Sequence, residues 1–214
     1  FARHEFVVEH MLTASDPETM SVRELLALDG DDGSALLDLR LGYSEPRGLP
    51  ALRRAIASLY ERTGDESVMV CAGAQEPILL FALATLEPGD EVIVQTPCYQ
   101  SLSEVMRWTG ATVVPWRVHE SERWQLDPER LPTLVTQRTK ALVVNVPHNP
   151  TGAVLEVDRW RRLMTLAERA GLWVLSDEAY RGLELDGPAL PAACDVYERA
   201  VSTGALAQGW GLGG

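Results

Sequence analysis

The chain has 214 residues, and its 19 Lys and Arg side chains against 31 Asp and Glu side chains give a net charge of −12 at pH 7. This excess of acid argues against a nucleic-acid-binding protein, which needs a basic face to neutralise phosphates. Hydrophobic residues make up 46% and charged residues 23% of the sequence. This composition is typical of a folded globular domain and excludes a disordered chain.

Cysteine usage and hydropathy point to a compartment. The three cysteines, Cys71, Cys98 and Cys194, are an odd number with wide spacing, which fits neither a disulfide framework nor a zinc ribbon. The sequence has no apolar run long enough to cross a membrane, and its first residues do not resemble a secretory signal. We therefore expect a cytoplasmic protein without a membrane partner.

Helical and strand patterns alternate from about residue 50. A helix is expected to begin at Pro50, because Leu52, Ile56 and Leu59 follow it at helical spacing. Further helices are expected at 78–86, 99–108, 128–135 and 156–170. Strands are expected at 67–71, 91–95, 112–116, 141–145, 172–176 and 200–203.

Apolar strands joined by helices predict the fold class. They indicate an α/β fold with a mainly parallel sheet sandwiched by helices. Residues 1–40 contain no strand–helix unit and are expected to form a separate helical arm, with one domain over residues 41–214. Ligands of such sheets collect outside the carboxyl ends of the strands. The loops at that edge are expected at 72–76, 96–99, 145–152, 177–180 and from 204 onward.

Three of these loops carry polar groups of complementary types. Residues 145–152 read Asn-Val-Pro-His-Asn-Pro-Thr-Gly, and residues 176–180 read Ser-Asp-Glu-Ala-Tyr. Residues 73–75, Gly-Ala-Gln, present free backbone N–H groups at the start of a helix, an arrangement that suits a phosphate. A phosphate site, a carboxylate and hydrogen-bonding side chains are therefore expected at one edge of the sheet.

At this point the chain resembles the fold type I pyridoxal-phosphate-dependent aminotransferases of class I and II. Five motifs carry the resemblance in the family's order: residues 43–53, 73–75, 96–99, 145–152 and 177–180. The resemblance implies the large domain of an aspartate aminotransferase-like protein with pyridoxal 5′-phosphate as cofactor. It also implies transfer of an amino group between an amino acid and a 2-oxo acid, by a ping-pong route through pyridoxamine phosphate.

The resemblance assigns the contacts to the cofactor's ring. Asp177 matches the carboxylate that keeps the ring nitrogen protonated, as its role of electron sink requires. Asn149 and Tyr180 match the donors to the phenolic oxygen, and Tyr99 matches the aromatic residue that stacks on the ring face. These roles place the four residues around one planar ligand.

The resemblance also assigns the phosphate contacts. Ala74 and Gln75 match the backbone that surrounds the phosphate. Tyr43 matches a residue that reaches the phosphate of a neighbouring subunit, and this role requires a homodimer.

Taken singly, these residues have structural alternatives. Residues 149–152 could be only a turn, and Asp177 could cap a helix. Tyr99 and Tyr180 could be core or rim aromatics. His148 reads as a structural residue held in its turn, and no histidine pair has metal-ligand spacing, so no metal site is expected.

The sequence departs from the family at the lysine that holds the cofactor as a Schiff base and moves the substrate's α-proton. In residues 204–214 Gln208 takes the lysine's place and Ala207 that of the preceding serine. The single lysine of the chain, Lys140, precedes the strand that leads to Asn149. Five residues of strand separate the two by about 16 Å, beyond the reach of a lysine side chain.

Without that lysine we expect little or no transaminase activity from this chain. The chain also ends before the family's phosphate-binding arginine and carboxyl-terminal domain, so a truncated protein is expected. Alternatives are an aminotransferase-like pseudoenzyme that acts in ligand binding or dimer assembly, and a lyase, decarboxylase or cyclase relative. The Gly-x-Gly-x-x-Gly spacing of residues 209–214 does not predict a dinucleotide site, because no helix or acidic residue follows it.

Overall fold

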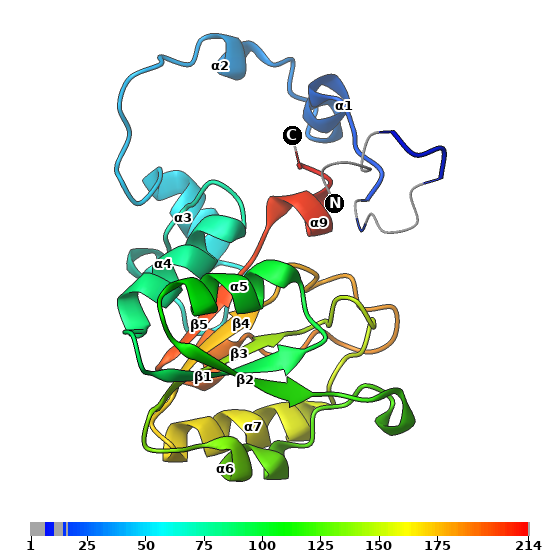
Figure 1. The fold of residues 1–214 in the computed structure, drawn as a ribbon. Coiled ribbons are helices and arrows are strands. Elements are labelled where there is room, and N and C mark those ends of the chain that lie inside the picture. The colour runs from blue at the N-terminus through cyan, green and yellow to red at the C-terminus, as the bar shows by residue number, and fades with distance from the viewer. Residues whose placement is uncertain (1–6, 11–14, 16, 214) are drawn as a thin grey trace.

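The computed structural model describes residues 7–10, 15 and 17–213, and its centre is a five-stranded parallel sheet (Figure 1). The strand order is β2-β1-β3-β4-β5, and every neighbouring pair is parallel. The strands are β1 Glu91–Thr96, β2 Thr112–Arg117, β3 Thr139–Asn145, β4 Trp173–Asp177 and β5 Ala200–Thr203. The expected α/β class and the expected strands from residue 91 onward are confirmed.

Helices cover both faces of the sheet, α4 and α5 on one side and α6 and α7 on the other (Figure 1). The helices are α1 Val22–Leu28, α2 Ser34–Leu37, α3 Pro50–Ala57, α4 Gln75–Thr85, α5 Gln100–Trp108, α6 Leu131–Leu134, α7 Val157–Arg169, α8 Ala193–Val196 and α9 Leu206–Trp210. Short 3₁₀ helices lie at Asp65–Ser67, Glu120–Glu122 and Pro128–Arg130.

The two faces of the sheet build two hydrophobic clusters. Within β1, Val92 and Val94 pack toward α4 and α5, whereas Ile93 packs toward α6 and α7. This alternation follows from the two-residue period of a strand, and apolar residues on both faces explain the uninterrupted hydrophobic runs in the sequence. On the α7 side, Trp160 is fully buried and its indole N–H donates to Pro191 O at 2.8 Å.

Two expected elements differ from the structure. The strand expected at 67–71 is wrong: a 3₁₀ turn occupies Asp65–Ser67, and Val70 N donates to Arg47 O at 3.0 Å rather than to a neighbouring strand. The β-rich composition of this segment therefore reflects an extended connection. The helix expected at 128–135 is a 3₁₀ turn followed by the four-residue α6, with prolines in both first turns.

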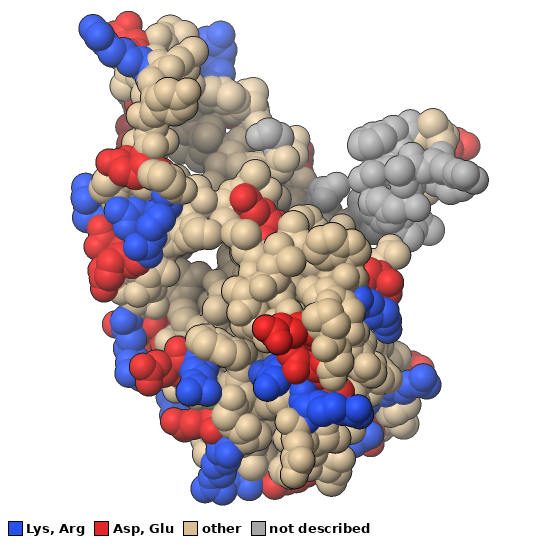
Figure 2. Space-filling model, turned by 60° about the vertical axis from the view of Figure 1, so that its left-hand side comes forward, with Lys and Arg blue, Asp and Glu red and all other residues tan. Residues whose placement is uncertain are grey.

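The N-terminal part of the described chain arches away from the sheet and returns at α3 (Figure 1). Ser21 caps α1 in a capping box with Glu24. Beyond α1 the side chains of Leu37, Leu41 and Tyr43 are almost fully exposed. Figure 2 shows an opening between this segment and the body that is bordered mainly by uncharged residues, whereas acidic and basic side chains are interspersed over the surface below it. In the part of the chain that is described, no helix is both long and apolar enough to cross a membrane.

Candidate functional site

The carboxyl ends of the central strands bring the predicted polar residues to one edge of the sheet. Asn145 at the end of β3 pairs in register with Asp177 at the end of β4, and Asp177 pairs with Thr203 at the end of β5. The loops that follow these three strands therefore leave the sheet side by side. They carry Asn149, Tyr180 and Gln208, respectively.

Asp177 is a buried carboxylate with one oxygen available to a ligand. Its Oδ1 atom accepts hydrogen bonds from Ala179 N at 3.2 Å and Thr203 Oγ1 at 3.4 Å. Its Oδ2 atom accepts none from the described residues, and it is not among their buried, unpartnered atoms. Burial raises the pKa of this carboxyl group, although the two hydrogen bonds oppose the rise. A cationic N–H group placed at Oδ2 would stabilise the ionised form.

Asn149 and Tyr180 lie together at the same edge of the sheet as this carboxylate. The Asn149 Nδ2 atom donates to Tyr180 Oη at 3.1 Å, and Tyr180 Oη donates to Ser15 Oγ at 2.9 Å. The Asn149 backbone N–H donates to Asn145 Oδ1 at 2.6 Å, and Asn145 Nδ2 donates to Asp177 O at 2.9 Å. Asn145 thus fixes the position of the loop after β3 relative to the end of β4. The amide and the phenol are close enough to donate to one shared acceptor.

His148 joins the loop after β3 to the loop after β1. Its Nε2 atom lies 2.8 Å from Pro97 O, and its Nδ1 atom lies 2.7 Å from Thr151 Oγ1. A carbonyl only accepts, so Nε2 carries the proton and Nδ1 accepts from the threonine hydroxyl. Burial lowers the pKa of His148, in keeping with this neutral form. The contact holds the segment that leads to Tyr99. This residue is the N-cap of α5, and its side chain is half-exposed.

The segment predicted to bind phosphate forms the start of α4. Ala74 is the N-cap residue of this helix, and its side chain makes no capping hydrogen bond. Gly73 precedes it with φ +76°, a conformation that favours glycine. Glu76 Oε2 accepts from Ala72 N at 2.6 Å and closes the turn. The first backbone N–H groups of the helix, including that of Gln75, have no intrahelical acceptor and suit an anion.

Gln208, Tyr43 and Lys140 are not joined by any described hydrogen bond to Asp177, Asn149 or Tyr180. Gln208 is half-buried in α9. The next residue, Gly209, lies close to the carbonyl oxygen of Arg181: a Cβ atom added to this glycine would be 3.9 Å from that oxygen. Tyr43 is fully exposed. Lys140 is exposed near the start of β3, at the opposite end of the sheet from Asn149.

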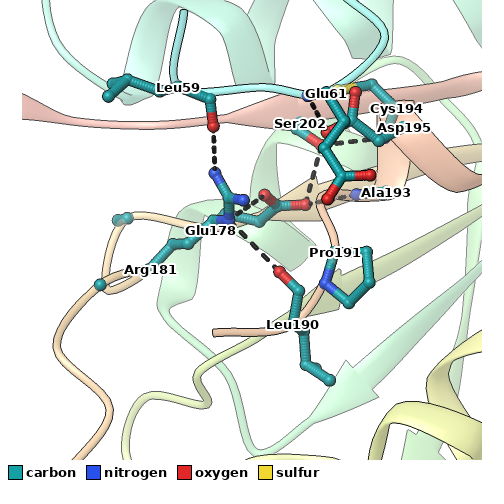
Figure 3. Close-up of polar contacts among 12 residues, drawn as sticks. Leu59, Glu61, Glu178, Arg181, Leu190, Pro191, Ala193, Cys194, Asp195 and Ser202 are labelled. Atoms are coloured by element: carbon teal, nitrogen blue, oxygen red, sulfur yellow. Dashed lines mark hydrogen bonds and ion pairs between the residues drawn. The ribbon is translucent and has the colours of Figure 1, made fainter. Parts of the chain in front are cut away.

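Glu178 and Arg181 support the site, and their roles were not predicted from the sequence (Figure 3). Glu178 is buried, and its Oε1 atom accepts from Ala193 N at 2.9 Å and Ser202 Oγ at 2.8 Å. Its Oε2 atom has no hydrogen-bond partner and lies 4.0 Å from Arg181 Nε. Burial raises the pKa of Glu178; the hydrogen bonds from Ala193 N and Ser202 Oγ oppose the rise most, and the Arg181 charge adds a smaller stabilisation of the carboxylate.

Arg181 connects three segments around Glu178. Its guanidinium group donates to Leu190 O at 3.4 Å and to Leu59 O at 3.2 Å, as Figure 3 shows, and it lies 5.3 Å from the centroid of the Tyr60 ring. Burial, together with the Glu178 charge, raises the pKa of Tyr60 to about 12. These contacts fix the loop that carries Tyr180.

Asp195 anchors the chain after α3 to the same region. Its carboxylate accepts from the backbone N–H groups of Glu61 at 2.9 Å and Arg62 at 2.8 Å. The sequence gives a weak signal for Glu178, which stands beside Asp177 in a recognised motif. It gives none for the contacts that Arg181 makes with Leu59 O and Leu190 O or for those of Asp195, because these partners are backbone groups separated from them along the chain.

Comparison with known proteins agrees with this geometry. Residues 22–214 match the family described as aminotransferase class I and II. The chain is 36% identical to the aspartate/prephenate aminotransferase of Thermus thermophilus, over 84% of this chain and 49% of that protein. It is 34% identical to the arginine–pyruvate transaminase of Pseudomonas aeruginosa, over 95% of this chain and 54% of that protein. The chain thus spans about half the length of these relatives.

Solved structures show the same relationship. A PLP-dependent aminotransferase from Streptococcus suis superposes with a TM-score of 0.89 at 30% sequence identity. The superposition covers 95% of this chain and 55% of the other. The sheet, its helical layers and the strand-end loops are therefore those of an aspartate aminotransferase-like large domain. The chain belongs to the class I and II aminotransferase family.

Proposed function

We propose that the chain is the cofactor-binding part of a pyridoxal-phosphate-dependent aminotransferase that acts on an amino acid and a 2-oxo acid. One observation carries the proposal: the available Oδ2 atom of buried Asp177 shares an edge of the sheet with the Asn149–Tyr180 pair. In this proposal residues 41–214 form the cofactor-binding domain and residues 1–40 an arm. Three unpaired cysteines favour a reducing compartment, the cytoplasm.

The residues present fit the chemistry of pyridoxal 5′-phosphate. Asp177 would accept the N–H of a pyridinium ring, because a cation at Oδ2 removes the penalty of its burial. Asn149 and Tyr180 would donate to the phenolic oxygen of that ring, and Tyr99 would cover its face. When bound, the cofactor supplies an electron sink for the pair of electrons left at the substrate's α-carbon.

The proposed phosphate contacts come from two subunits. The N–H groups at Ala74 and Gln75 would hold the phosphate, since they point out of the start of α4. Tyr43 is fully exposed on a segment that arches away from its own sheet (Figure 1), so it is free to reach a second copy of the chain. We therefore propose a homodimer in which each Tyr43 serves its neighbour's site.

Gln208 sets the catalytic competence of this chain. It stands where the family places lysine, and a carboxamide neither forms an imine nor serves as a base near neutral pH. Losing a general base typically costs about 10² to 10⁴ in rate. We therefore propose that the chain binds the cofactor but has little or no transaminase activity, as in an aminotransferase-like pseudoenzyme.

Gln208→Lys tests both statements. The variant is expected to attach pyridoxal 5′-phosphate covalently, so that borohydride reduction adds the cofactor mass to the peptide containing residue 208. Gln208→Arg is the matched control, because arginine supplies the charge but does not form a stable imine with this aldehyde. Peptide mass spectrometry measures the attachment. A Gln208→Lys chain that binds the cofactor but is never labelled would show that residue 208 does not occupy the lysine's place.

A further inference from the structure

We propose that this site holds its cofactor reversibly and selects the amine form, pyridoxamine 5′-phosphate, with the Gln208 carboxamide oxygen accepting the ammonium group. The inference rests on the proposed cofactor site and names the form of the cofactor that the site prefers. It is carried by three features of the chain: the position of its single lysine, the position of Gln208 and the chemistry of a carboxamide.

The only lysine is too far from the site to hold an aldehyde covalently. Lys140 lies near the start of β3, whereas Asn145 at the other end of this strand pairs with Asp177. The lysine side chain is exposed beside the turn that contains Glu87 and Asp90. The aldehyde form therefore loses the covalent bond that a lysine would give it. Its affinity then depends on the same ring and phosphate contacts that the amine form makes.

Gln208 lies on the segment that passes the proposed ring site. This segment leaves β5 at Thr203, whose hydroxyl donates to Asp177 Oδ1 at 3.4 Å. Five residues later, Gln208 is half-buried in α9, and its neighbour Gly209 lies beside the carbonyl oxygen of Arg181, one residue after Tyr180. The segment therefore starts at the Asp177 carboxylate and reaches the loop that carries Tyr180.

Hydrogen-bond strengths decide between the two cofactor forms. A carboxamide could donate an N–H to an aldehyde oxygen, a bond between neutral groups, or accept from an ammonium group, a charge-assisted bond about twice as strong. The net charge of −12 also favours the ligand that carries an additional positive charge. The guanidinium of Arg181 is directed to Glu178, Leu59 and Leu190. We expect the amine to bind about five- to tenfold more tightly than the aldehyde.

Three ligands that differ only at the 4′ position isolate this interaction. Isothermal titration of the chain with pyridoxamine 5′-phosphate, pyridoxal 5′-phosphate and 4-deoxypyridoxine 5′-phosphate measures affinity without requiring activity. The deoxy compound keeps the ring and phosphate but has no polar atom at 4′. We expect the amine to bind most tightly and the deoxy compound to bind about tenfold more weakly than the amine.

Two substitutions assign the preference to residue 208. Gln208→Leu keeps a similar volume and should remove the amine's advantage while leaving the affinity for the deoxy compound within about twofold. Gln208→Glu should strengthen binding of the amine alone, since a carboxylate accepts more strongly than an amide. Circular dichroism and melting temperature establish that both variants fold. If one of them does not fold, the other variant and the three ligands still test the inference.

The outcomes separate failure of this inference from failure of the proposed function. An amine advantage that disappears in Gln208→Leu supports the inference. Equal affinities for the three ligands, or an advantage that survives Gln208→Leu, would overturn the inference and leave the cofactor site standing. Borohydride fixation of the aldehyde to the unaltered chain would also overturn it. If none of the three ligands binds, the proposed function fails, and this inference fails with it.

Discussion

Asp177→Asn is expected to weaken binding of pyridoxamine 5′-phosphate by about 10²-fold, because removing one partner of a buried, hydrogen-bonded charge pair costs roughly 2–5 kcal/mol. The substitution keeps the size of the side chain, and its Oδ1 atom still accepts from Ala179 N and Thr203 Oγ1. Only the negative charge at Oδ2 is lost. The effect therefore reports on the ionic contact to the ring nitrogen and not on a change of fold.

The same substitution is expected to stabilise the unliganded chain by about 1 kcal/mol at pH 7, as replacements of strained functional groups often do. Burial raises the pKa of Asp177, so the folded state binds its proton more tightly than the unfolded state. The cost of burial is absent below the unfolded pKa, near 4, and grows as the pH rises through the folded pKa. The stability gained from Asp177→Asn should therefore be absent at low pH and increase over the same pH range.

Urea unfolding between pH 3.5 and 7, with titration calorimetry at pH 7, measures both effects. Asp195→Asn is the matched control: Asp195 is also a buried carboxylate, but both of its oxygens accept backbone N–H groups. An amide nitrogen cannot accept, so this variant should lose about 1–3 kcal/mol of stability and keep its affinity for the ligand. Unchanged affinity in Asp177→Asn would mean that Asp177 does not face the ring nitrogen.

Arg181→Met is expected to destabilise the chain by about 2 kcal/mol, because it removes two hydrogen bonds to carbonyl groups and the cation nearest to the buried Glu178 carboxylate. The lost hydrogen bonds are those to Leu59 O and Leu190 O. Because Tyr180 lies between Glu178 and Arg181 in the same loop, binding of pyridoxamine 5′-phosphate should weaken as well. Equilibrium unfolding and titration calorimetry provide the two measurements.

A double-mutant cycle separates the charge effect from lost packing. Glu178→Gln removes the charge but keeps an oxygen that accepts from Ala193 N and Ser202 Oγ. The double variant with Arg181→Met should therefore lose less unfolding free energy than the two single variants lose together, by at least about 1 kcal/mol. Arg162→Met breaks an exposed ion pair with Glu129 and should cost less than about 1 kcal/mol. Strict additivity of the two losses at Glu178 and Arg181 would contradict the assigned pairing.

The layers of the fold could be predicted because local patterns determine them. Buried strands such as β3 and β4 are apolar on both faces, and amphipathic helices such as α7 separate them, so the parallel sheet follows from periodicity. The positions of Asn149, Asp177 and Tyr180 at one edge then follow from the parallel strands. What these residues bind was suggested by motif resemblance, because an Asn-Pro-Thr-Gly turn or an Asp-Glu pair has no single function.

Other features depend on contacts that a single sequence does not encode locally. The segment at 67–71 has the composition of a strand, but its backbone N–H at Val70 finds its acceptor on Arg47. The role of Arg181 depends on carbonyl groups at residues 59 and 190 and on a carboxylate at 178. The four-residue α8 is too short to show a helical period. It packs against β5, where Cys194 N donates to Ser202 Oγ at 3.1 Å.

A crystal structure of the chain with pyridoxamine 5′-phosphate tests the central claim most directly. We expect the ring nitrogen within about 3 Å of Asp177 Oδ2, as in a charge-assisted hydrogen bond. The phenolic oxygen should lie beside Asn149 and Tyr180, and the phosphate at the start of α4. A ligand bound elsewhere, or a ring whose nitrogen points away from Asp177, would contradict the account.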